Sequence, residues 1–241
     1  MSLTLLDYER LMGQPVVRAS IRRAQICAGG SYDEFVDQLY LDIDQLIYSM
    51  QSAPELRQDD SEDRLSGEIL QGLRLLGYDA YPDGKTGGHV DMTVKMAAYS
   101  WLGEAKKDGN FDEGLLQLTT RYKTASGNFA HNQAGLVFYM VASPNAKSLL
   151  KGWSDKLATQ NCSPVQCPNN VLAYFSAHIV DGAGTDLKVR TMGVSLYHKP
   201  KDKSARTSAK RKAAKAAAAG ASTAASQGSA TKGGAPGASK P

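Results

Sequence analysis

The 241-residue sequence has only three cysteines and no long apolar segment. Cys27, Cys162 and Cys167 do not have the number or spacing of a four-ligand zinc site, so we expect reduced thiols. No apolar run approaches the roughly 18 residues that a membrane span needs. The N-terminus carries acids early and lacks the apolar centre of a signal peptide, so we expect a cytoplasmic protein without a membrane partner.

The last 42 residues lack every side chain that could build a core. Residues 200–241 contain nine Lys or Arg and one acid, whereas the rest of the chain has 19 bases and 23 acids. A segment of this composition cannot bury enough surface to offset the entropy of ordering it. We expect a disordered tail that either only solubilises the protein or attracts polyanions through Lys210, Arg211, Lys212 and Lys215.

The body has enough apolar residues, 42% of the chain, for a globular core. Apolar residues at helical spacing predict a helix over 32–50 with Ser31 as its cap, and another from the cap Ser61 to residue 76. Further helices are expected over 3–12, 16–27, 112–123 and 145–160, and strands over 77–82, 89–95, 98–107, 135–143, 171–180 and 187–198. We therefore expect an α/β protein with a mixed sheet flanked by helices. Its expected parts are a helical extension (1–60), the α/β domain (61–199) and the tail (200–241).

Charged residues interrupt the two strands expected over 89–95 and 98–107. A two-residue turn at 97–98 would pair Met96 with Tyr99, and this register places Asp91 opposite Glu104 on one face. Lys106 follows two residues later on the same face. A slip of one residue would break this pairing.

Two adjacent carboxylates need a cation to remain ionised at close range. Mg²⁺ suits such a site, with Mn²⁺ as a substitute, because it binds through one or two carboxylates and keeps water or phosphate oxygens in its shell. We expect Asp91 and Glu104 to be ligands, with the main-chain carbonyl of Ala105 as a third. Lys106 would orient a water molecule or stabilise charge in the transition state.

The order of these residues resembles the PD-(D/E)xK nuclease superfamily, in its restriction-endonuclease-like and Mrr-like branch. The resemblance covers residues 61–142 and rests on a helical acid, Glu68, a Gly-Gly-x-x-Asp segment ending at Asp91, the Glu104-x-Lys106 motif and Gln117 on the next helix. It implies a restriction-endonuclease-like core and metal-dependent phosphodiester hydrolysis, with Glu68 and Gln117 in the site beside Asp91, Glu104 and Lys106. The proline that names the family is replaced by Val90.

Each motif alone has an ordinary structural explanation. Glu-x-Lys is usually a solvated strand face, and Glu68, Gln117 and His89 are each more often structural or surface residues. Their combination in this order favours a DNA endonuclease in restriction or antiviral defence, with His89 and Lys107 contacting the nucleic acid. A junction resolvase, a repair nuclease and a ribonuclease remain alternatives within this class, acting alone, as a homodimer or with protein partners. The alternative of another class is a catalytically silent nucleic-acid-binding or assembly protein.

Overall fold

The computed structural model describes residues 4–83, 90–121, 131–181, 184–200 and 202. The chain divides into two units, Met1–His198 and Lys199–Pro241. Nearly all of the second unit lies outside the described residues, and with it the predicted disorder and the residues Lys210, Arg211, Lys212 and Lys215. His89 also lies outside them. No helix in the described ranges combines the length and the apolar character that crossing a bilayer would require.

Helices form the N-terminal third of the chain, as the apolar spacing predicts. They are α1 (Leu5–Met12), α2 (Pro15–Cys27), α3 (Tyr32–Gln51), the short 3-10 helix η1 (Pro54–Arg57) and α4 (Glu62–Leu75). The Ser31 hydroxyl accepts the Glu34 N–H while the Glu34 carboxylate accepts the Ser31 N–H, which completes a capping box. The Ser61 hydroxyl accepts the Arg64 N–H at the start of α4. Both predicted caps are therefore confirmed.

A seven-stranded mixed sheet follows, in the spatial order β1-β2-β3-β4-β7-β6-β5. Its central strands β3, β4 and β7 are parallel, and the outer strands pair antiparallel. The strands are β1 (Asp79–Asp83), β2 (Val90–Met96), β3 (Tyr99–Lys107), β4 (Gln133–Met140), β5 (Val165–Gln166), β6 (Ala173–Ile179) and β7 (Asp186–Ser195). The sequence predicted the mixed sheet but not β5, whose two residues are both exposed.

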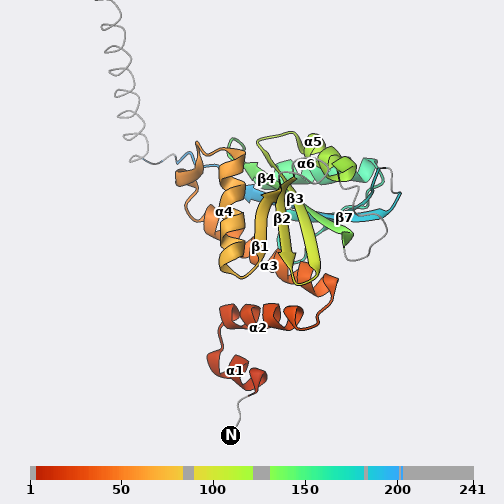
Figure 1. The fold of residues 1–241 in the computed structure, drawn as a ribbon. Coiled ribbons are helices and arrows are strands. Elements are labelled where there is room, and N and C mark those ends of the chain that lie inside the picture. The colour runs from red at the N-terminus through yellow and green to blue at the C-terminus, as the bar shows by residue number, and fades with distance from the viewer. Residues whose placement is uncertain (1–3, 84–89, 122–130, 182–183, 201, 203–241) are drawn as a thin grey trace, which may run out of the picture. The chain divides into compact units, whose positions relative to one another are not determined.

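Helices cover both faces of the sheet (Figure 1). One face packs against α3 and α4 and contains Trp101, Ala105, Val137 and Tyr139. The other face packs against α5 (Phe111–Arg121) and α6 (Ala146–Thr159) and contains Leu136, Phe138, Leu150 and Trp153. Every residue of β4 is buried, which confirms it as a central strand between the two cores.

The β2–β3 hairpin has the predicted register. Met96 pairs with Tyr99 across the turn, and the pairing continues to Met92 opposite Gly103. Ala97 in the turn has φ 51°, the left-handed conformation that tight hairpin turns use. Continuing this register by one residue brings Asp91 to Glu104. On the other side of β3, Glu104 pairs with Leu136 of β4, so the acid belongs to the sheet face that α5 covers.

Candidate metal-dependent active site

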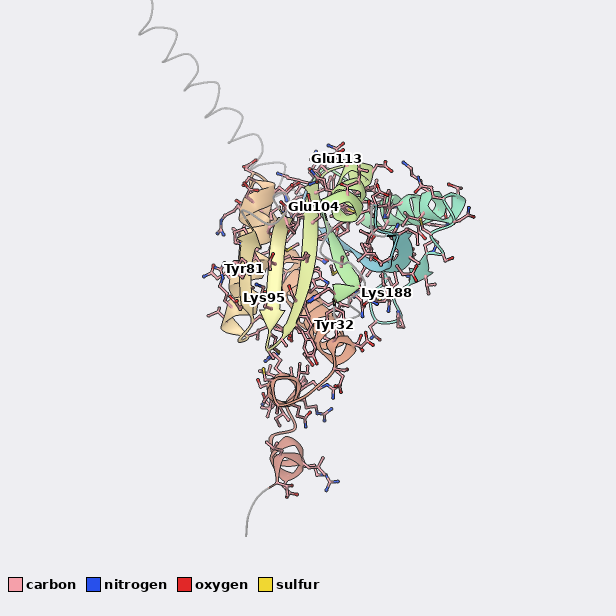
Figure 2. All side chains as sticks on the ribbon, turned by 45° about the vertical axis from the view of Figure 1, so that its right-hand side comes forward. Tyr32, Tyr81, Lys95, Glu104, Glu113 and Lys188 are labelled. Carbon is pink, nitrogen blue, oxygen red and sulfur yellow. The ribbon has the colours of Figure 1, made fainter. Side chains whose placement is uncertain are left out.

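The Lys106 ammonium lies among three carboxylates at the end of β3. Its Nζ is 2.8 Å from Glu104 Oε1, 3.7 Å from Glu62 Oε1 and 3.9 Å from Asp91 Oδ2. Glu104 is almost completely buried, with 2% of its surface exposed. Figure 2 shows Glu104 on the central strands near α5, which carries the labelled Glu113, and away from Lys95 at the far end of β2. The structure thus brings together three of the predicted site residues, Asp91, Glu104 and Lys106.

Asp91 is fixed against the strand that carries the other two. Its Oδ2 accepts the N–H of Ala105 at 2.8 Å. Asp91 is one residue and Ala105 two residues beyond the last pair of the β2–β3 ladder, Met92 with Gly103. The side chain therefore replaces a main-chain acceptor at the point where the two strands separate. This hydrogen bond holds the Ala105 N–H against the Asp91 carboxylate. Coordination of a metal by the Ala105 carbonyl stays a prediction.

Glu62, the first residue of α4, supplies the third carboxylate, which the sequence analysis did not identify. Its Oε2 accepts the N–H of Lys107 at 2.6 Å, and the Lys107 ammonium donates to the carbonyl of Asp60 at 2.6 Å. These two bonds tie the start of α4 to the end of β3. An acid in a first helical turn is ordinarily explained by the helix dipole, so the sequence offered no separate signal for Glu62.

Glu68, the helical acid of the predicted set, pairs with Arg57. The Arg57 guanidinium holds both its carboxylate oxygens, and this hydrogen bond raises the pKa of Arg57 despite the opposing effect of burial. Burial raises the pKa of Tyr139, and the charges of Asp91, Glu62 and Glu68 raise it further. The buried Tyr139 hydroxyl, which lies 3.2 Å from the Ser66 hydroxyl, is thus within electrostatic reach of all three acids.

Helix α5 approaches the site through a glycine. A Cβ added at Gly114 would lie 3.0 Å from Lys106 Cγ and 2.8 Å from a Leu136 methyl, so only glycine lets the helix pack this closely over the lysine stem. Gln117, predicted as a site residue, follows three positions later and so lies on the same side of the helix. Its Oε1 is buried and has no hydrogen-bond partner among the described residues.

The site has more negative than positive charge. Burial alone would lower the pKa of Lys106, but its hydrogen bond to Glu104 and the charges of Glu104, Asp91 and Glu62 raise it, so the side chain is an ammonium at neutral pH. Burial raises the pKa of Glu62, and Asp91 adds to this, against the opposing effects of Lys106 and the Lys107 N–H. One ammonium therefore faces three acids, an arrangement that attracts a second cation.

The donor set fits a magnesium ion that retains part of its water shell. Asp91 and Glu104 supply two hard oxygens beside Lys106, and Gln117 Oε1 is a buried neutral oxygen without a hydrogen-bond partner among the described residues. In the described ranges, no three His, Cys, Asp or Glu side chains form a ready metal cage. Two carboxylates are nevertheless the usual protein contribution to a Mg²⁺ site that also binds phosphate.

Comparisons with known proteins return no relative. No protein-family model, no curated protein and no solved structure matches this chain.

Proposed function

We propose that this chain is a metal-dependent nuclease that hydrolyses DNA phosphodiester bonds, built on a restriction-endonuclease-like core. Mg²⁺ is the expected ion, Mn²⁺ its substitute, and RNA the alternative substrate. The sequence order Glu68, Asp91, Glu104-x-Lys106 and Gln117 supports the proposal. A role in restriction or antiviral defence, and the involvement of protein partners, belong to the same proposal.

One observation carries it: the partly buried ammonium of Lys106 faces three carboxylates at the end of β3. A bound divalent ion would supply Lewis acidity and a more acidic water at neutral pH. Asp91 and Glu104 would hold it, and Asp91 is already oriented by the Ala105 N–H. Lys106, held as a cation, is placed to stabilise negative charge that develops on a phosphate.

The test is cleavage of supercoiled plasmid, linear duplex and RNA by the purified full chain, in Mg²⁺, Mn²⁺ or EDTA. Asp91→Asn and Lys106→Met should abolish a metal-dependent activity while the circular dichroism spectrum is retained. Matched controls are Asp79→Asn on β1 and Lys95→Met on β2, because both residues are exposed and both should tolerate the change. Cleavage that survives both site substitutions would refute the assignment of the site.

A second function, binding without turnover, is favoured by one feature of the same cluster. Lys106 and Glu104 already neutralise each other at 2.8 Å, as a purely structural buried ion pair would. In that case the chain is a nucleic-acid-binding or assembly protein. It would bind duplex with an affinity that Asp91→Asn leaves unchanged, and it would cut no substrate in any metal.

A further inference from the structure

Helices α2 and α3 enclose a groove that is separate from the acidic cluster. Its volume is about 880 Å³, and its apolar wall includes Pro15, Val16, Leu41 and Leu76. Val16 is 69% exposed and Leu41 52% exposed, although both line the groove. Arg18, Arg22 and the Arg23–Asp42 ion pair also line it, and Arg22 pairs with Glu34 beside it. The charged side chains that line the groove therefore number three bases and one acid. An apolar groove of this size is typical of a site that a partner covers.

Helix α1 exposes apolar side chains. It packs on α2, and α2 lies between it and α3 in Figure 1, so α1 stays outside its own groove. Leu5 and Leu6 are 63% and 54% exposed. Gly13, at φ +57°, links α1 to α2 through a two-residue connection in which its Cβ position meets no neighbour.

We infer that the groove of each copy receives α1 of a second copy, which gives a symmetric dimer. Leu5 and Leu6 would fill the apolar wall around Leu41 and Val16. In sequence, α1 carries two acids and one base, which complements the arginines of the groove, whereas the basic segment after residue 199 would be repelled by them.

The position of the groove suits a reciprocal exchange. Its wall begins at Pro15 and Val16, in the first turn of α2, and α1 joins the chain at the same end of that helix. If two copies meet at these ends, each short linker carries α1 across the twofold axis into the partner's groove. Exchanging an identical element about a hinge such as Gly13 is a low-cost route to a dimer. This inference is independent of the proposed nuclease activity.

The first test measures the mass of the full chain by light scattering over a wide range of concentrations. The wild type should be a dimer that dissociates on dilution. Leu41→Asp, and separately Leu5→Asp with Leu6→Asp, should raise the dissociation constant by about 10- to 100-fold, since each removes buried leucine from the contact. Leu116→Asp on α5 is the matched control, because Leu116 is 53% exposed and lies outside the groove.

The second test identifies the seat of α1 with variants that keep the fold. One copy carries Leu6→Cys and the other Leu41→Cys, both with Cys27→Ser to remove an exposed thiol. Oxidation should yield a disulfide-linked dimer in the mixture, and far less when either variant is oxidised alone. A wild type that is monomeric at every concentration overturns the inference. So does a dimer that Leu41→Asp leaves intact, or one that Leu116→Asp weakens equally.

Discussion

Replacing Lys106 by methionine tests the charge balance of the acidic cluster directly. Methionine keeps most of the lysine volume but leaves Glu104, 2% exposed, without the ammonium that lies 2.8 Å away. Removing one partner of a buried ion pair costs about 3–5 kcal/mol, because the remaining carboxylate loses the opposite charge beside it. Lys106→Met should therefore lower the free energy of unfolding by about this amount in EDTA, measured by urea denaturation.

Added Mg²⁺ should stabilise Lys106→Met more than it stabilises the wild type, because the ion replaces the positive charge that Lys106 places beside Glu104 and Asp91. At a concentration of 100 times its dissociation constant the ion contributes about 2.7 kcal/mol. The control is Lys106→Met combined with Glu104→Gln, which removes both charges and should recover most of the lost stability without responding to Mg²⁺. If Mg²⁺ shifts the denaturation midpoint of none of these proteins, the cluster is a structural ion pair and the metal site is refuted.

Three further predictions follow from single contacts. Glu62→Gln keeps an acceptor for the Lys107 N–H and removes a carboxylate whose pKa burial raises, so stability in EDTA should not fall. Cleavage by this variant should fall about 10- to 100-fold in a plasmid assay. Gly114→Ala should displace the Lys106 stem and reduce cleavage, with a change of less than about 1 kcal/mol in urea denaturation because alanine favours the helix. Burial lowers the pKa of His178 from 6.5 to about 4, so the unfolded chain binds a proton that the folded chain does not. Stability should then fall as the pH drops from 6.5 to 4, by about 3 kcal/mol at pH 4, and His178→Gln should remove this part of the loss in pH-dependent thermal melts.

The parts of the fold that local chemistry decides could be read from the sequence. Ser31 and Ser61 cap their helices because a hydroxyl three residues before a free N–H is a local device. The pairing of Met96 with Tyr99 follows from a two-residue turn between alternating strands, and that register alone brings Asp91 to Glu104. The exposed pair Val165–Gln166 was missed because two residues give no periodicity to detect.

The presence of Glu62 beside Lys106 could not be read in the same way. Periodicity places Glu68 on the flank of the apolar stripe of α4, but it does not say which turn of the helix meets the end of β3. That is decided by long-range contacts: the Lys107 N–H and the Lys107 ammonium hold Glu62 and Asp60, which brings the first turn of α4 to the site. Arg57, from the preceding 3-10 helix, donates a hydrogen bond to the Glu68 carboxylate. Helical spacing therefore identifies which side of α4 faces the sheet. Which turn of α4 meets the end of β3 depends instead on the conformation of the chain between Gln51 and Ser61. Two variants distinguish the roles of Glu68 and Glu62. Glu68→Gln should lower stability, because it weakens the pair with Arg57, and should leave cleavage nearly unchanged. Glu62→Gln should do the reverse.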